Sequence, residues 1–180
     1  LHEPKERKKM KLSLVIPCYN EQDNVELFYN TATEAFKDKG FEYELIFVND
    51  GSRDQTMDKL LHIYDIADEN VKVVGFSRNF GKESAIYAGL KESRGEMVCL
   101  IDADMQQRPE LVLDMMKILD NDPSYDAVAC YQEDRRESKV LSAFKNCFYK
   151  LINKTSEIEF KSGASDFRLL RRVVVDAVLI

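Results

Sequence analysis

The sequence predicts an α/β fold, a doubly wound, mostly parallel sheet with helices on both faces. Short apolar runs rich in β-branched residues alternate with amphipathic stretches of helical length, and a polar cluster follows each of the first four runs. With 180 residues, of which 44% are hydrophobic and 32% charged, the chain can bury one core without disulfides. In such sheets, ligands bind outside the carboxyl ends of the strands.

The alternation runs through the first 131 residues. In chain order, the expected elements are a strand at 12–17, a helix at 20–39, a strand at 43–48, a helix at 52–67, a strand at 71–76, a helix at 81–92, a strand at 97–101, a helix at 109–119 and a strand at 126–131. Gly40 ends the first helix, and Pro109 lies in the first turn of the fourth. Ser52 and Gln55 have capping-box spacing for the second helix.

The regular pattern breaks after Tyr131. Residues 139–152 have helical spacing, and two interpretations stay open: packing on the domain, or a basic amphipathic helix at a membrane interface. Residues 162–168 predict a turn of small residues. From Arg135 to Arg172 there are ten Lys or Arg against four Asp or Glu, although the whole chain carries a net charge of -6. This basic segment indicates either an anionic partner, such as phosphate or a membrane surface, or an ordinary solvated helix face.

The sequence disfavours several common kinds of catalytic and cofactor-binding site. The four cysteines lack C-x-x-C spacing and histidine partners, which favours buried free thiols in a reducing cytoplasm and argues against zinc. The histidines are His2 in the charged tail and His62 within an expected helix, so a Ser-His-Asp or Cys-His site is disfavoured. Phe76 and Glu83 occupy positions where a P-loop needs Gly and Ser or Thr. No G-x-G-x-x-G follows the first strand, which disfavours a dinucleotide oxidoreductase.

Asp102 and Asp104 directly follow the fourth apolar run. If the chain is still extended there, both side chains point the same way and can bind one cation. The alternative is that two acids merely end a strand and begin a turn. Polar clusters after the other strands, at residues 17–21, 49–52 and 77–82, converge on the same predicted edge. This convergence favours a metal site that binds a departing nucleoside diphosphate.

Three segments resemble, in order and spacing, the signature of glycosyltransferase family 2: Val15-Ile16-Pro17-Cys18-Tyr19-Asn20-Glu21, Val48-Asn49-Asp50-Gly51-Ser52-Arg53-Asp54 and Asp102-Ala103-Asp104-Met105-Gln106. Further segments look like the polyprenyl-phosphate sugar transferases, such as dolichyl-phosphate mannose synthase and bactoprenol glucosyltransferase: Arg78 to Lys82, Ala88-Gly89, Arg135-Arg136 and Ser162 to Arg168. The resemblance covers nearly all of residues 11–172. It implies the GT-A fold of nucleotide-diphospho-sugar transferases and a membrane-associated enzyme of cell envelope biosynthesis.

The resemblance also implies roles for the donor side of the site. The residues expected to bind the nucleotide are Pro17, Tyr19, Glu21, Asp50 and Asp102. The residues expected to hold Mg or Mn against the diphosphate are Asp102, Asp104 and Gln106. A carboxylate can accept the ring N–H of uracil or guanine, and a proline beside an aromatic ring offers a flat apolar wall.

On the acceptor side, the resemblance implies that Arg135 and Arg168 bind a phosphate, with Arg136 left as an alternative to Arg135. Asp104 and Asp166 are expected to be catalytic. An acceptor phosphate is already anionic at neutral pH, so Asp166 is expected to position groups or shape charge, with a general-base role as second choice.

The implied reaction is inverting, metal-dependent transfer of a sugar from a UDP- or GDP-sugar to a polyprenyl phosphate. One alternative is a family 2 transferase that acts on a saccharide or protein hydroxyl, for which a base such as Asp166 would be indispensable. An alternative of another class is a non-catalytic nucleotide-binding regulatory module. The expected partners are the nucleotide sugar, the polyprenyl lipid and a membrane surface, with no nucleic acid; a homo-oligomer stays open, as do the sugar and the base.

Two expectations concern the organisation of the chain. Residues 1–10 read as a charged tail, either a native arm or an expression remnant, and residues 11–180 as a glycosyltransferase catalytic domain. The resemblance implies that the domain is cut before C-terminal transmembrane helices. It also implies a location on the cytoplasmic face of the plasma membrane.

Overall fold

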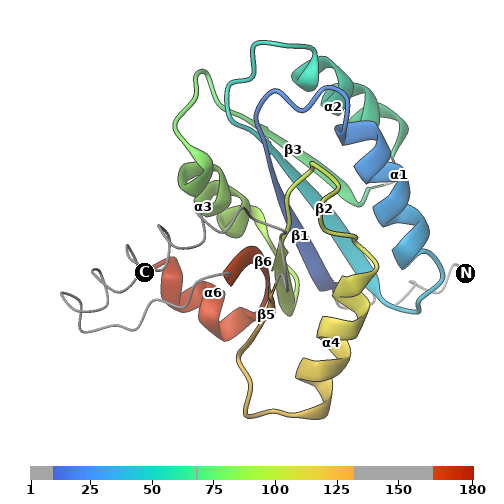
Figure 1. Ribbon diagram of the computed structural model, residues 1–180, viewed down its shortest axis with the longest axis vertical. Coiled ribbons are helices and arrows are strands. Elements are labelled where there is room, and N and C mark those ends of the chain that lie inside the picture. Colours follow the sequence, from blue (N-terminus) through green and yellow to red (C-terminus); the bar gives the residue numbers. More distant parts are fainter. Residues whose placement is uncertain (1–9, 68, 132–163) are drawn as a thin grey trace, which may run out of the picture. The chain divides into compact units, whose positions relative to one another are not determined.

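A computed structural model describes residues 10–67, 69–131 and 164–180 (Figure 1). The chain divides into two compact units, one formed by Leu1–Val128 with Phe167–Ile180 and the other by Ala129–Asp166. The first unit holds most of the described residues. The helix expected at 139–152 and the Arg135-Arg136 pair lie outside the described residues.

Strands and helices alternate from Met10 to Tyr131 as predicted. The strands are β1 (Met10–Cys18), β2 (Glu42–Asn49), β3 (Val71–Gly75), β4 (Met97–Leu100), β5 (Ala127–Tyr131) and β6 (Ala164–Arg171). The helices are α1 (Val25–Phe36), α2 (Thr56–Ile66), α3 (Lys82–Glu92), α4 (Leu111–Asn121) and α6 (Arg172–Val178). All nine elements expected before residue 132 are present, with ends shifted by a few residues.

The six strands form one mixed sheet in the order β3-β2-β1-β4-β6-β5. Pairing is parallel between β1 and β2, between β2 and β3 and between β1 and β4, whereas β6 runs antiparallel to β4. From β1 the chain winds outward through β2 to β3, and then returns through α3 to place β4 on the other side of β1. This reversal of direction beside β1 is the point at which α/β sheets bind ligands.

Helices cover both faces of the sheet, which confirms the doubly wound prediction (Figure 1). On one face, Ala85 of α3 and Val175 of α6 belong to a buried cluster with Val15 and Ile46. On the other face, Phe28 of α1 packs edge to face against Phe47 of β2, with ring centroids 6.1 Å apart. Successive side chains of a strand point to opposite faces of the sheet. Consecutive apolar residues such as Ile46 and Phe47 therefore pack against the helices on both faces.

The prediction of a small-residue turn at 162–168 is wrong from Ala164 onward, because β6 begins there. Asp166 and Arg168 are exposed, whereas Phe167 and Leu169 are buried. This two-residue alternation is typical of a half-buried strand, and the backbone of Arg168 pairs with Leu100 of β4. The alternation therefore outweighs the turn tendency of Ala and Ser.

The capping-box prediction for α2 is also wrong. The Ser52 hydroxyl and N–H donate to Asn49 Oδ1 at 2.5 and 3.2 Å, so Ser52 closes the turn after β2. The helix begins at Thr56, and Asp54 Oδ1 accepts the Thr56 N–H at 3.0 Å and the Thr56 hydroxyl at 2.6 Å. Asp54 therefore forms an Asx turn with the first residue of α2, a common arrangement at helix starts, and Ser52 takes no part in it.

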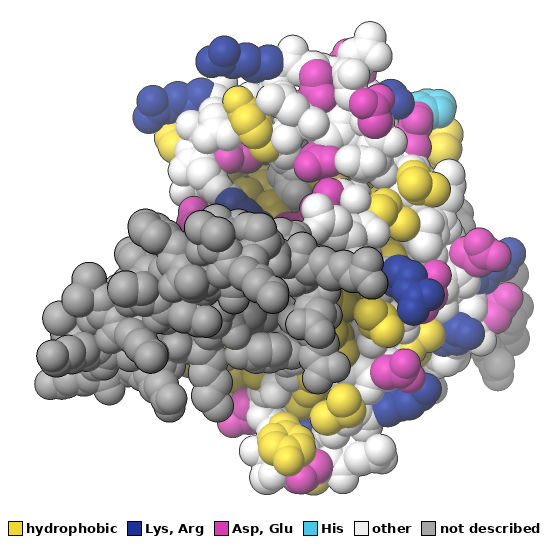
Figure 2. All heavy atoms as spheres, in the orientation of Figure 1, with side chains coloured by type: hydrophobic (Ala, Val, Ile, Leu, Met, Phe, Trp, Pro, Cys, Tyr) yellow, Lys and Arg dark blue, Asp and Glu magenta, His cyan; other side chains and the backbone are white. Residues whose placement is uncertain are grey.

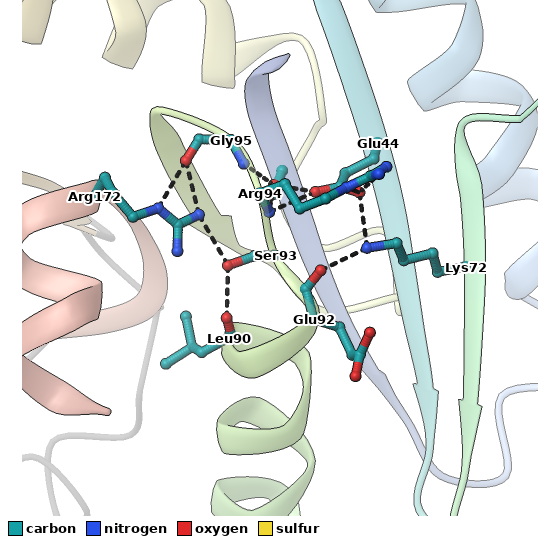
Figure 3. Close-up of polar contacts among 9 residues, drawn as sticks. Glu44, Lys72, Leu90, Glu92, Ser93, Arg94, Gly95 and Arg172 are labelled. Atoms are coloured by element: carbon teal, nitrogen blue, oxygen red, sulfur yellow. Dashed lines mark hydrogen bonds and ion pairs between the residues drawn. The ribbon is translucent and has the colours of Figure 1, made fainter. Parts of the chain in front are cut away.

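A buried carboxylate ties together the amino ends of three parallel strands (Figure 3). Glu44 of β2 accepts hydrogen bonds from Ser13 Oγ at 2.7 Å and from the Arg94 N–H at 2.7 Å. Lys72 Nζ lies 3.2 Å from Glu44 Oε2, and the Arg94 guanidinium lies 3.1 Å from the same atom. Nearby, the Arg172 guanidinium donates to the Gly95 carbonyl oxygen, which anchors the start of α6 to the same loop.

This cluster predicts how stability depends on pH. Burial by itself raises the pKa of Glu44, but the hydrogen bonds from Ser13 and Arg94 and the charge of Lys72 outweigh burial and lower that pKa from its ordinary value of 4.5. A carboxyl with a lowered folded-state pKa stabilises the fold above its unfolded pKa, and this stability is lost as pH falls through the folded value.

Glu44→Gln is therefore expected to destabilise the chain by about 1 to 3 kcal/mol at neutral pH, because the buried carboxylate that accepts charge-assisted hydrogen bonds from the more exposed Lys72 and Arg94 is lost. The difference from wild type should shrink as pH falls below 4.5. Urea unfolding from pH 7 to 3 measures both effects. Glu26→Gln is the control, since Glu26 forms a half-exposed pair with Lys59 at 3.1 Å and its replacement should cost less than about 1 kcal/mol. Equal losses for the two variants would contradict the assignment.

Candidate active site

A cavity of about 410 Å³ opens at the carboxyl ends of the parallel strands. It is lined by Pro17, Cys18, Tyr19, Glu21, Asp50, Asn79, Gly81, Lys82, Ala85, Asp102, Ala103 and Asp104. The loops after β1, β2, β3 and β4 all contribute, so the predicted convergence of four loops is confirmed. On the face seen in Figure 2, Asp and Glu side chains gather around a hollow that shows hydrophobic side chains inside.

The loop after β1 is joined to the loop after β2 by reciprocal hydrogen bonds. The Asn20 N–H donates to Ser52 Oγ at 3.0 Å, and the Arg53 N–H donates back to Asn20 Oδ1 at 2.9 Å. The Glu21 N–H donates to Thr56 Oγ1 at 2.8 Å. Asn20 has a φ of 56°, a conformation that Asn tolerates better than most residues. These contacts fix the backbone that carries Tyr19 and Glu21 at the cavity.

Asp50 connects the loop after β2 to the loop after β3. Its side chain is buried, Oδ1 accepts the Phe80 N–H at 2.7 Å and Oδ2 accepts the Gly81 N–H at 2.9 Å. Because an ionised carboxylate offers about four acceptor positions, Asp50 can hold this loop and still accept a ligand N–H. Asp50 therefore sets the start of α3, where Lys82 is the first residue.

Gly51 allows these two loops to approach closely. It has a φ of +63°, and a Cβ placed there would lie 2.2 Å from the Arg78 carbonyl carbon and 2.6 Å from the Asn79 nitrogen. Both the backbone conformation and the space require glycine. The Asp50-Gly51 pair thus fixes the loop after β3 from two sides.

Asp102 and Asp104 follow the turn alternative and not the extended one. β4 ends at Leu100, Ala103 and Asp104 form a turn, and Met105 has a φ of 60°. Both carboxylates nevertheless line the cavity, and Asp104 Oδ1 accepts the Gln106 N–H at 3.0 Å. A turn rather than a strand therefore brings the two acids to one cavity.

Lys82 is a site residue that the sequence analysis did not assign. Its Nζ lies 2.8 Å from Asp102 Oδ1 and 2.9 Å from Asp102 Oδ2. The available signal was its position at the start of a helix, directly after the polar cluster that follows β3. Its pairing with Asp102 depends on the placement of β4 beside β1, which sequence spacing does not reveal.

The cavity fits a divalent cation that is bound together with a phosphate ligand. Both Asp102 oxygens already face a cationic group, the Lys82 ammonium, and Asp104 lines the same cavity. Within the described ranges, no cluster of three or more His, Cys, Asp or Glu could hold a metal by itself. Mg²⁺ commonly binds through one or two carboxylates plus substrate phosphates, which matches this pair. Gln106 is exposed and is not among the lining residues, so its role as a ligand stays a prediction.

Cys18 lines the cavity but is not suited to nucleophilic catalysis. Burial raises the pKa of its thiol, and the nearby carboxylates Glu21 and Asp102 raise it further. The thiol is therefore neutral at physiological pH, and Sγ donates weakly to the Ile16 carbonyl oxygen at 3.4 Å. Since the thiolate is the reactive form, Cys18 serves as part of the cavity wall.

The structure gathers all of the residues predicted for nucleotide binding, together with Asp104, around the cavity: Pro17, Tyr19, Glu21, Asp50 and Asp102. Of the predicted acceptor residues, Arg168 lies exposed on β6, and its backbone pairs with Leu100 at the carboxyl end of β4. Asp166 is also exposed on β6, two residues earlier. Among the described helices, none is long and apolar enough to cross a lipid bilayer.

An open α/β sheet with an acidic cavity at its switch point is a ligand-binding arrangement that many classes of protein share, and comparison with known proteins identifies the class. The profile of glycosyl transferase family 2 matches residues 13–179. The chain belongs to this family.

Curated relatives give the same assignment. The chain is 40% identical over 168 residues to the protein CsbB of Bacillus subtilis (strain 168), covering 93% of the chain and 50% of the relative. It is 35% identical over 170 residues to the prophage bactoprenol glucosyl transferase homolog of Escherichia coli (strain K12) and to the bactoprenol glucosyl transferase of Shigella phage SfX, covering 94% of the chain and 55% of each relative. The chain therefore spans about half the length of these relatives.

Solved structures share the fold. The mannosyltransferase PcManGT from Pyrobaculum calidifontis, in complex with GDP-Man and Mn²⁺, matches with a TM-score of 0.68 and 19% identity, covering 96% of the chain and 47% of that protein. S. aureus TarS 1-349 in complex with UDP matches with a TM-score of 0.65 and 23% identity, covering 94% and 49%. The expected GT-A type of fold is confirmed.

Proposed function

We propose that the protein transfers a sugar from a UDP- or GDP-sugar to a polyprenyl phosphate, with inversion at the anomeric carbon. The cavity supports the part of the proposal that concerns the nucleotide-sugar donor. Two carboxylates of the loop after β4 line it, and Pro17 and Tyr19 form an apolar and aromatic wall. The acceptor half is supported by relatives that are named bactoprenol glucosyl transferases and cover nearly all of the chain.

On the donor side, the residues divide between the base and the diphosphate. Pro17 and Tyr19 offer a flat surface for the nucleobase, and Glu21 and Asp50 supply acceptors for its ring N–H groups. Asp102 and Asp104 would hold Mg²⁺ or Mn²⁺, which would supply charge neutralisation for the departing diphosphate. The solved complexes of PcManGT with Mn²⁺ and GDP-Man and of TarS with UDP support a donor of this kind.

In the proposed reaction, a phosphate oxygen of the lipid forms a bond to the anomeric carbon as the bond from that carbon to the diphosphate oxygen breaks. The nucleoside diphosphate leaves with the electron pair, so no covalent enzyme intermediate is required. Arg168 on β6, together with Arg135 or Arg136 outside the described residues, is proposed to bind the acceptor phosphate. Asp166 is proposed to position the reacting groups rather than to remove a proton.

The membrane surface and the polyprenyl lipid are proposed as partners, and the cytoplasmic face of the plasma membrane as the location. The support is the basic segment from Arg135 to Arg172, which carries ten Lys or Arg against four Asp or Glu. The bactoprenol-named relatives agree with a lipid acceptor.

A transfer assay with matched acceptors tests the proposal. The whole protein is incubated with UDP-glucose or GDP-mannose, Mn²⁺ or Mg²⁺, and either polyprenyl phosphate or the corresponding polyprenol in vesicles, and the lipid products are identified by mass spectrometry. We expect a glycosyl phosphate lipid from the phosphorylated acceptor and no product from the alcohol. Transfer to the alcohol or to a saccharide, with none to the phosphate, would contradict the proposed acceptor.

A further inference from the structure

The cavity has a strong excess of negative charge. Glu21, Asp50, Asp102 and Asp104 line it, and Lys82 is the one cationic side chain among its described lining residues. A nucleoside diphosphate is itself anionic, so its binding requires that cationic groups face the phosphates. In the structure, however, this ammonium group contacts the Asp102 carboxylate.

The Lys82–Asp102 pair has the geometry of an occupied cation site. Nζ lies 2.8 Å from one Asp102 oxygen and 2.9 Å from the other, so the ammonium faces both oxygens that a divalent cation would use. Lys82 and a metal ion at this carboxylate would therefore compete. The two side chains are 38% and 27% exposed, which leaves the pair open to exchange with solvent and ligands.

The backbone that carries Lys82 is fixed, whereas its side chain can rotate. Asp50 binds the N–H groups of Phe80 and Gly81 directly before it, and Lys82 is the first residue of α3. A lysine side chain is a point charge on a flexible four-carbon stem, so the ammonium can move between partners without any backbone change. Gly81 and Lys82 both line the cavity, so an anion bound there lies within reach of this side chain.

We propose that Lys82 is an exchangeable counter-cation of the donor site. Its ammonium group neutralises Asp102 before the donor binds. When a divalent cation binds the Asp102 carboxylate, the ammonium group moves to a diphosphate oxygen. This inference rests on the proposed function, because it assumes that a metal and a nucleoside diphosphate bind in this cavity. It gives Lys82 opposite effects on the two ligands: the side chain opposes binding of the metal alone and favours binding of the nucleotide with the metal.

The test uses Lys82→Met, which retains a linear side chain but lacks the charge. Binding of Mn²⁺ without nucleotide is measured by titrating the whole protein and following free Mn²⁺ by electron paramagnetic resonance. Binding of UDP or GDP at saturating Mn²⁺ is measured by calorimetry. Without nucleotide, we expect Mn²⁺ to bind about three- to tenfold more tightly than to wild type, because the competing ammonium is gone. With Mn²⁺ present, calorimetry should show nucleotide binding weakened about tenfold, because a charge-assisted contact is lost.

Two further variants make the result specific. Lys91→Met removes a lysine from the same helix, where Nζ lies 5.2 Å from the Tyr87 ring, and should change neither affinity. Lys82→Arg keeps the charge and should stay close to wild type in both titrations. Far-ultraviolet circular dichroism verifies that each variant is folded.

The proposal is supported if Lys82→Met binds Mn²⁺ more tightly than wild type and binds the nucleotide more weakly. Any other combination of the two affinities overturns it. A lysine that only stabilised the loop would weaken both ligands together when replaced. The wild-type titrations separate this inference from the proposed function. If wild type binds UDP or GDP together with Mn²⁺, but Lys82→Met does not change the two affinities in opposite directions, only the proposed role of Lys82 is wrong. If wild type binds neither nucleotide, the donor assignment and the exchange both fail.

Discussion

Asp104→Asn is expected to lower the rate of sugar transfer by about 10²- to 10³-fold, the scale at which loss of one preorganised electrostatic contact acts. The substitution keeps an oxygen that can accept the Gln106 N–H, which Asp104 Oδ1 accepts at 3.0 Å, so the turn after β4 should be preserved. Only the charge is lost. Asp102 is then the one carboxylate of this turn that remains to hold a divalent cation against the diphosphate.

Asp122→Asn is the matched control for this variant. Asp122 Oδ1 accepts the Ser124 N–H at 2.9 Å in a similar turn, but Asp122 follows α4 and is not part of the cavity. It should transfer sugar at the wild-type rate. Initial rates at several Mn²⁺ concentrations provide the comparison. Full activity of Asp104→Asn at every metal concentration would show that Asp104 is not part of the metal site.

Gly51→Ala is expected to destabilise the protein by about 2 to 3 kcal/mol more than an ordinary replacement of glycine at positive φ. A methyl group at this position would lie 2.2 Å from the Arg78 carbonyl carbon, and backbone atoms cannot rotate away as a flexible side chain can. The loops after β2 and β3 would have to separate. Separation would also pull the Phe80 and Gly81 N–H groups from Asp50, so nucleotide binding should weaken as well.

Gly40→Ala distinguishes the steric effect from the backbone effect. Gly40 has a φ of +79°, close to the +63° of Gly51, but no atom lies within 4 Å of where its Cβ would be. Its replacement should cost only about 1 to 2 kcal/mol, the usual penalty for a left-handed conformation. Urea unfolding of both variants gives the difference. Equal losses would mean that the close approach of Gly51 to Arg78 does not restrict the fold.

The location of the site could be predicted because it depends on local patterns. Apolar runs mark the strands, and polar residues directly after them must lie at the carboxyl edge of a parallel sheet. For this reason Asp50, Asp102 and the Pro17–Glu21 segment were expected together, and they do line one cavity. The β-strand pattern of Phe167 and Leu169 was also in the sequence, but the small residues before it indicated a turn instead.

The contacts inside the site could not be predicted in the same way. Asp50 bonds to backbone groups 30 and 31 residues away, and Lys82 pairs with a carboxylate 20 residues away. Such contacts follow from the strand order, which places β4 next to β1 rather than next to β3. Neither the chain spacing of Lys82 and Asp102 nor the composition of their loops specifies this neighbour relation.

Calorimetric titration with UDP and GDP, each with and without Mn²⁺, tests the central claim most directly. We expect one of the two nucleotides to bind the wild-type protein when Mn²⁺ is present and to bind far more weakly without it. Asp102→Asn should abolish this difference, because Asp102 is the carboxylate that already holds a cationic group in the cavity. Binding that is equally tight with and without metal, or no binding of either nucleotide, would contradict the assignment of this cavity as the metal-dependent donor site.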